Sequence, residues 1–294
     1  IDEANHPYSA GIYSGAGDIF TPEHSLIQKS DLVICLGVCA NELLRMDRFP
    51  PSVISIKLPE TPCSERVESI RTFSDDAVEE CISLLQAIDW GLPELKLAKK
   101  TIFERMKSSH FLPISTFEII AERFHSSRRL VLDTGNFCTI AEHFWQARSP
   151  DEVLLAGNSR FMGTSIPMAI GASIVDPKTP VVVGVGDGGI SMYLSELRLV
   201  ADKQLPILIL LLSDGEFGSI SERAIAAGLT TTPLKRTTNN WVSIIESIGI
   251  KSYQATNEAQ LISAVDQWDP ASGPMFVECV FAAEPYRQMV AGIR

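Results

Sequence analysis

The residues best suited to chemistry in this chain are two aspartates that each follow a short apolar run. Asp187 stands within the Gly-Asp-Gly-Gly sequence of residues 186–189, after the apolar run 180–185, and Asp214 follows the apolar run 206–212. Glycines let a backbone approach a ligand closely and expose amide donors. Such a turn also occurs as a simple tight turn, so on its own it decides little.

The spacing of the two aspartates predicts that they meet. A helical pattern over residues 193–202 separates the two apolar runs, and such a strand–helix–strand unit returns the chain to the same edge of a parallel sheet. We therefore expect Asp187 and Asp214 to end adjacent strands. Two facing carboxylates repel each other unless a cation lies between them. A hard divalent cation with oxygen ligands, some of them from a phosphate, fits this arrangement.

The surrounding elements alternate between strand and helix patterns from about residue 113 onward. Strands are predicted over 130–132, 153–156, 180–185, 206–212, 251–254 and 275–281, and helices over 115–125, 137–146, 166–175, 193–202, 240–248 and 257–268. Earlier in the chain, two apolar runs (32–38 and 52–58) predict strands and residues 75–88 predict a helix. The fold class predicted is α/β, with two doubly wound Rossmann-like domains and mostly parallel sheets.

This pattern predicts a first domain over residues 1–92, a basic linker over 93–112 and a second domain over 113–294. The net charge of −11 argues against a nucleic-acid or anionic-membrane partner, because both need basic patches. No apolar run is long enough for a membrane span, and the six scattered cysteines are typical of reduced thiols in a cytoplasmic protein.

The ordered set formed by residues 186–189, Glu196-Leu197, Leu205-Pro206 and Ser213-Asp214 resembles the signature of thiamine-diphosphate enzymes. That signature is Gly-Asp-Gly followed, after a helix and a strand, by Asn-Asn. The resemblance implies Mg²⁺ as the metal, with Asp187 as the first ligand, Asp214 as the second, and the backbone carbonyl of Glu216 as another. Asp214 departs from the usual Asn, and its extra negative charge should strengthen the hold on the metal.

The same resemblance implies further residues that bind thiamine diphosphate. Gly135 and Asn136 end a strand where the family binds the terminal phosphate. Met162, next to Phe161, would hold the two rings of the bent cofactor, although an ordinary core position is the alternative. The remaining cofactor-binding residues implied are Gly186, Gly188, Gly189, Asp214, Phe217 and Gly218.

Residues 1–3, 6–7, 11–15 and 30–33 resemble the middle domain of pyruvate and indolepyruvate decarboxylases. In these relatives a separate pyrimidine-binding domain supplies the glutamate that activates the cofactor. We expect this glutamate to come from a partner chain or an upstream part, so the chain would act within a homo- or hetero-oligomer. The isolated chain should bind Mg²⁺ and thiamine diphosphate weakly and catalyse nothing.

The resemblance implies a 2-oxo acid substrate. Ile220 stands where pyruvate decarboxylases carry a catalytic glutamate, whereas acetolactate synthases and pyruvate oxidases have an apolar residue there. Acetolactate-synthase-like carboligation is therefore favoured. A simple decarboxylase that releases an aldehyde, and a non-catalytic cofactor-binding subunit of a split enzyme, remain the alternatives. Glu222 and Arg223 either face the substrate or lie on an exposed helix face, and the Thr-rich stretch 229–240 is a candidate flap.

A nicotinamide-dinucleotide protein is another alternative, because Gly184, Gly186 and Gly189 fit the spacing of its glycine motif and Asp214 could supply the acid that follows. In that case Asp187 would place a carboxylate against the pyrophosphate with no metal to offset it. Bound nicotinamide without a metal would favour this interpretation.

Overall fold

The computed structural model describes residues 7–11, 21–36, 53–56, 79, 83, 90–124, 128–156, 160–236 and 240–293. The chain divides into two compact units, one made mainly of residues 3–104 and the other of residues 105–291. The domain boundaries expected from the sequence stay a prediction. Among the helices of the described ranges, none has the length and apolar character needed to cross a membrane.

The described part of the first unit contains two parallel strands, a short helix and most of the longer helix Leu92–Met106. Strand β1 (Val33–Leu36) pairs with β2 (Val53–Ile56), and helix α1 (Pro22–Ile27) precedes them. Both strands lie within the apolar runs that predicted them. The helix predicted over 75–88 falls outside the described residues, apart from Glu79 and Ser83, which are helical.

The segment expected to be a basic linker is largely a helix, α3 (Leu92–Met106). Leu95, Ile102 and Met106 are buried, and their spacing of seven and four residues places them on one helical face. Charged side chains occupy much of the rest of the helix. Because these charges dominate the sequence of the segment, they predicted a linker although an apolar stripe was present.

The second unit is built on six strands, all parallel, in the order β4-β3-β5-β6-β8-β7. Their bounds are β3 Arg129–Leu132, β4 Val153–Leu155, β5 Val181–Gly186, β6 Ile207–Ser213, β7 Lys251–Ala255 and β8 Met275–Val280. Every strand predicted for this region is present, so the α/β class is confirmed. The chain passes from β3 to β4 on one side and then to β5 on the other. In open sheets of this kind, ligands bind beyond the carboxyl ends of the strands at such a switch point.

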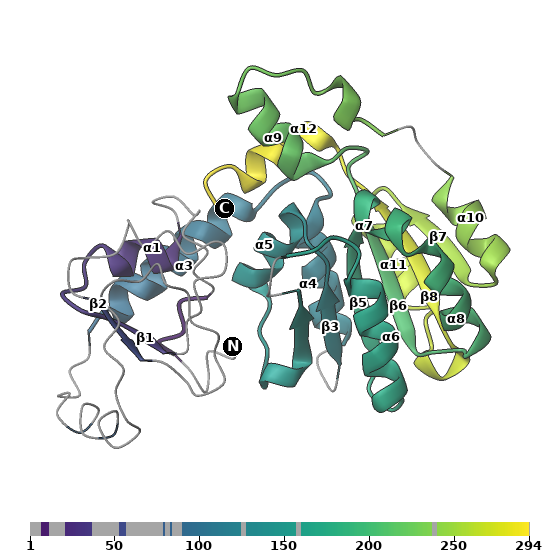
Figure 1. Cartoon of the computed structure of the whole chain (residues 1–294), viewed down its shortest axis with the longest axis horizontal. Helices are drawn as coiled ribbons and strands as arrows, with labels where there is room; N and C mark the ends of the chain where they lie inside the picture. The colour runs from purple at the N-terminus through teal and green to yellow at the C-terminus, as the bar shows by residue number, and fades with distance from the viewer. Residues whose placement is uncertain are drawn as a thin grey trace. The chain divides into compact units, whose positions relative to one another are not determined.

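Helices cover both faces of the sheet (Figure 1). The helices of this unit are α4 Pro113–Arg123, α5 Asn136–Phe144, α6 Ser165–Val175, α7 Asp187–Met192, α8 Leu197–Asp202, α9 Gly218–Ala226, α10 Trp241–Ile248, α11 Glu258–Val265 and α12 Ala283–Val290, of which α9 and α12 lie beyond the strand ends (Figure 1). Short 3-10 turns occupy Pro150–Glu152, Leu194–Glu196, Thr232–Leu234 and Pro270–Ser272. Two expectations were wrong. The helix predicted to begin at residue 115 begins at Pro113, whose φ is preset for a first turn. The single helix predicted over 193–202 is a 3-10 turn followed by α8.

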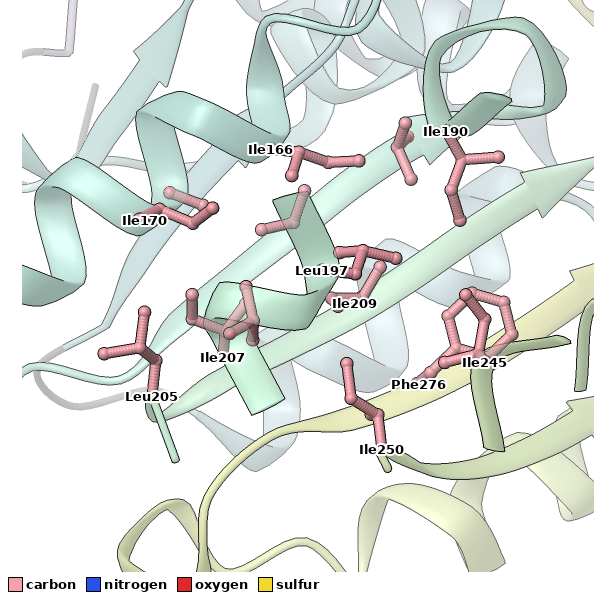
Figure 2. Close-up of a cluster of buried hydrophobic side chains, with 14 of the residues drawn as sticks. Ile166, Ile170, Ile190, Leu197, Leu205, Ile207, Ile209, Ile245, Ile250 and Phe276 are labelled. Carbon is pink, nitrogen blue, oxygen red and sulfur yellow. The ribbon is translucent and has the colours of Figure 1, made fainter. Parts of the chain in front are cut away.

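The core lies between the sheet and the helices α6, α8 and α10. Figure 2 shows Ile207 and Ile209 of β6 facing Ile166 and Leu197 of two different helices. Every residue of β6 is buried. Burial of one large aliphatic side chain stabilises the fold by about 1.5–3 kcal/mol, so the central strands form a firm base for the loops at their ends.

Candidate functional site at the ends of three strands

Three aspartates directly follow three neighbouring strands: Asp133 follows β3, Asp187 follows β5 and Asp214 follows β6. Since β5 lies between β3 and β6 and all three are parallel, their carboxyl ends meet at one edge of the sheet. Gly186 is level with Leu212 in the register. The strands that carry Asp187 and Asp214 are therefore adjacent, as the spacing predicted.

Asp187 is buried and is held by the turn that carries Asp214. Its Oδ1 accepts a hydrogen bond from the Ser213 hydroxyl at 3.0 Å, and its Oδ2 accepts one from the Gly215 amide at 3.4 Å. Burial raises the pKa of Asp187. Hydrogen bonds from Ser213, Gly215 and Trp241, together with the charge of Arg236, offset part of this effect.

Asp214 is the more strongly perturbed acid. Burial above all, and then the negative charges of Asp187 and Glu216, raise its pKa to about 7, although the Glu216 amide donates to its Oδ1 at 3.2 Å. Without a cation, the carboxylate of Asp214 is thus about half protonated near neutral pH. A divalent ion between Asp187 and Asp214 would offset the repulsion between their two negative charges.

Glu216 presents its backbone, not its side chain, to this pair of acids. Its carboxylate is bound to the guanidinium of Arg287 in α12. Glu216 lies opposite Lys235 in an isolated antiparallel bridge. The hydrogen bonds of this bridge join the residues before and after Glu216 to the residues before and after Lys235. In a bridge of this type, the amide and carbonyl of Glu216 itself point away from Lys235. The amide reaches Asp214, donating to its Oδ1 at 3.2 Å.

The donor set fits a hard cation that is only partly surrounded by protein. In the described ranges, no three His, Cys, Asp or Glu side chains could hold a metal ion by themselves. A cation at Asp187 and Asp214 would therefore complete its shell with a backbone carbonyl, such as that of Glu216, and with oxygens from outside the protein. Phosphate oxygens meet this requirement.

The glycines of the turn 186–189 are required by their surroundings. A Cβ at Gly188 would lie 2.7 Å from Cε1 of Phe217 and 2.9 Å from Cε of Met162. A Cβ at Gly189 would lie 1.8 Å from Oδ2 of Asp133. Phe217 and Met162 therefore pack directly on Gly188, and Asp133 packs on Gly189, so neither position has room for a side chain.

Asn136 connects the end of β3 to helix α9. Its Oδ1 accepts from the Ser219 hydroxyl at 2.7 Å, and its Nδ2 donates to Glu222 at 2.9 Å. A Cβ at Gly218 would lie 2.7 Å from Oδ2 of Asp214 and 3.3 Å from Nδ2 of Asn136. The structure thus brings Asn136 and Gly218 close to Asp214, and Asn136 in turn binds Glu222.

The other predicted residues are less closely gathered. Phe161 is 64% exposed, and its backbone carbonyl accepts hydrogen bonds from the hydroxyls of Thr134 and Thr164. Arg223 is exposed on α9, and Ile220 is 49% exposed. Gly135 adjoins the ring of Phe137, because a Cβ there would come within 2.4 Å of it.

The structure adds residues that the sequence did not single out as ligands or anchors. Arg236, from the predicted flap, donates to the Ser191 hydroxyl at 2.9 Å and lies 5.3 Å from the centre of the Phe217 ring. Arg287 binds Glu216 although it lies 71 positions further along the chain, and no local sequence pattern predicts this contact. Asp133 did carry a signal, because an acid directly after a buried strand is the feature that drew attention to Asp187.

The glycine spacing of a dinucleotide motif does not form a turn here. Gly184 lies inside β5, paired with Leu132 and Leu210, and Gly186 is the last residue of the strand.

Comparisons with known proteins agree with the geometry. A family model for the C-terminal TPP binding domain of thiamine pyrophosphate enzymes matches residues 133–279. The chain is 23% identical over 290 residues to the acetolactate synthase isozyme 2 large subunit of Escherichia coli (strain K12), a match that covers 92% of this chain and 51% of that protein. It is 25% identical over 172 residues to the mitochondrial acetolactate synthase catalytic subunit of Saccharomyces cerevisiae, covering 57% of this chain and 25% of the yeast protein. Over 135 residues it is 27% identical to the acetolactate synthase large subunit of Lactococcus lactis subsp. lactis, covering 46% and 24% respectively. The chain thus spans about half the length of the E. coli protein and about a quarter of the other two.

Proposed function

Because the chain belongs to the thiamine pyrophosphate enzymes, through their C-terminal TPP binding domain, we propose that it binds thiamine diphosphate through Mg²⁺. Asp187, Asp214 and the carbonyl of Glu216 would hold the ion. The observation that carries the proposal is the pair of acids at the ends of adjacent parallel strands, the buried Asp187 and the half-buried Asp214. Burial above all, and then the charge of Asp187, raises the pKa of Asp214. A metal bridged to a diphosphate satisfies both carboxylates at once.

The remaining predicted residues would each contact one part of the cofactor. Asn136 and Gly135, at the end of β3, would bind the terminal phosphate. Gly186, Gly188, Gly189 and Gly218 would offer backbone amide donors to the diphosphate. Met162 and Phe217, which pack together on Gly188, would offer an apolar surface to the rings.

We further propose that the substrate is a 2-oxo acid and that the outcome is carboligation of the acetolactate-synthase type. Bound thiamine diphosphate supplies a nucleophilic carbon and accepts the electrons left when a 2-oxo acid loses carbon dioxide. Ile220 has no proton to donate and is 49% exposed on α9, which favours transfer to a second carbonyl over protonation to an aldehyde. Simple decarboxylation and a non-catalytic cofactor-binding role are the competing proposals.

The chain would need a second contributor for turnover. The activating glutamate is expected from a pyrimidine-binding domain or subunit of the same enzyme, so we propose an oligomeric assembly. Asp187, Asp214 and Glu216 are engaged with one another and with Arg287 and are not suited to replace it.

The binding proposal is tested by titrating the chain with thiamine diphosphate in a calorimeter, with and without Mg²⁺. We expect binding only with Mg²⁺, loss of binding in Asp187→Asn, and unchanged binding in Asp202→Asn, an exposed acid on α8 that pairs with Arg198. Failure of the wild-type chain to bind at saturating Mg²⁺ would overturn the proposal.

The reaction proposal needs a separate assay. The chain alone, loaded with cofactor and Mg²⁺, should release no carbon dioxide from pyruvate. After addition of a pyrimidine-binding partner, acetolactate should exceed acetaldehyde among the products. Predominant acetaldehyde would favour the simple decarboxylase, and turnover without a partner would refute the shared active site.

A further inference from the structure

Asp133 lies between the two glycine turns of the site. It is 1% exposed, and its carboxylate accepts the Gly163 amide at 2.7 Å on Oδ1 and 2.9 Å on Oδ2. On the other side, the missing side chain of Gly189 makes room for Oδ2, since a Cβ there would lie 1.8 Å away. One carboxylate therefore touches both the turn 161–164 and the turn 186–189.

The carboxylate also caps helix α6 from another part of the chain. Thr164, the residue at the N-cap position, makes no capping hydrogen bond with its side chain. The amide of Gly163, directly before Thr164, instead donates to Asp133, and the nearby amide of Ser165 at the start of the helix also favours the ionised carboxylate. The first amides of a helix need acceptors and favour negative charge, so Asp133 fixes the start of α6 to the end of β3.

The residues on both sides of Met162 are hydrogen-bonded to Asp133 and Thr134, the two residues that directly follow β3. The Thr134 hydroxyl donates to the carbonyl of Phe161 at 3.4 Å, and Asp133 accepts from the amide of Gly163. Gly163 has a φ of +84°, and a Cβ there would lie 2.5 Å from the Tyr193 ring, so this turn has little freedom to shift.

We propose that Asp133 is a positioning residue of the cofactor site, which fixes Met162 against the turn 186–189. The role rests on the proposed function, in which Met162 packs under the cofactor rings. Loss of the carboxylate charge would leave the amides of Gly163 and Ser165 with a weaker acceptor, and the Met162 side chain would lose its single placement. Asp133 would then affect cofactor affinity without touching the cofactor.

The test uses the full chain with 13C-labelled methionine methyl groups. Met162→Leu assigns the Met162 signal among the seven methionines of the chain. In Asp133→Asn we expect the Met162 signal to shift or broaden, and the affinity for thiamine diphosphate with Mg²⁺ to fall about tenfold. Mg²⁺ affinity measured alone should stay at the wild-type value, whereas a general loss of structure would lower both affinities.

Thr134→Val is a second variant, because it removes the hydroxyl that holds Phe161 and keeps the charge and shape of the site. It should move the Met162 signal in the same direction by a smaller amount, while Asp202→Asn should move nothing. An unchanged Met162 signal in Asp133→Asn overturns the inference. If the Met162 signal shifts in Asp133→Asn while the wild-type chain binds no thiamine diphosphate, that pair of results overturns the proposed function, and with it the cofactor role of Asp133.

Discussion

Replacing Asp214 by asparagine should stabilise the metal-free protein, and more so at high pH. Burial and the nearby charges of Asp187 and Glu216 raise the pKa of Asp214 from 3.8 to about 7. Between these two pH values the folded chain binds more protons at this site than the unfolded chain. The free energy of unfolding of the wild type therefore falls as the pH rises from 3.8 to about 7. Asp214→Asn has no ionisable group at this position, so its free energy of unfolding does not fall for this reason.

The size of the effect follows from the pKa difference. At pH 8 the ionised carboxylate costs the folded state at most about 4 kcal/mol, because each pKa unit corresponds to about 1.4 kcal/mol. At pH 5 only the stability that is lost between pH 3.8 and pH 5 is already gone, roughly 1–2 kcal/mol. The stabilisation by Asp214→Asn should thus grow by roughly 2–3 kcal/mol from pH 5 to pH 8.

Urea unfolding in EDTA, followed by tryptophan fluorescence, measures this difference, since Trp145, Trp241 and Trp268 lie in the unit that carries the site. Adding Mg²⁺ should stabilise the wild type more than Asp214→Asn, and the exposed control Asp202→Asn should show no pH dependence of its effect. The reasoning is refuted if Asp214→Asn is the less stable form at pH 8, or if its gain is equal at both pH values.

Two further substitutions test the packing around the site. Gly189→Ala should destabilise the chain by about 2–3 kcal/mol and weaken binding of thiamine diphosphate, because the new methyl group collides with Asp133; Gly171→Ala, with nothing within 4 Å in α6, should instead be neutral or stabilise by up to about 1 kcal/mol in the same urea assay. Arg236→Gln should raise the rate of limited proteolysis within residues 229–240, because it removes the bond to Ser191; equal cleavage in the wild type would argue against this anchor.

The central geometry of the site could be predicted from the sequence. Short apolar runs separated by a helical pattern identify parallel strands, and the right-handed connection between them places Asp187 next to Asp214. These inferences succeed because both the pattern and the crossover are local in the chain. The roles proposed for Met162, Asn136 and Glu216 remain predictions.

Other features depend on contacts that no local pattern encodes. The helix α7 starts at Asp187, with glycines in its first turn, although glycine has a low helix propensity; burial of Ile190 in the core outweighs this preference. The helix α12 and its Arg287 reach Glu216 from far along the chain. Arg287 is thus part of the site only because the chain folds back on itself.

The order of the strands has a consequence for how this protein opens. Strand β6 lies between β5 and β8, is buried along its whole length, and ends at Ser213. Its amide protons should therefore be among the slowest of this unit to exchange with solvent deuterium, because β6 is paired on both sides. The loop 215–217 depends instead on two backbone bonds to residues 234 and 236 and on the ion pair of Glu216 with Arg287, so it can open locally without separating the strands. In the proposed site, the two acids would adjoin the slowest-exchanging strand, while the segment that carries Glu216 would open many times before that strand does.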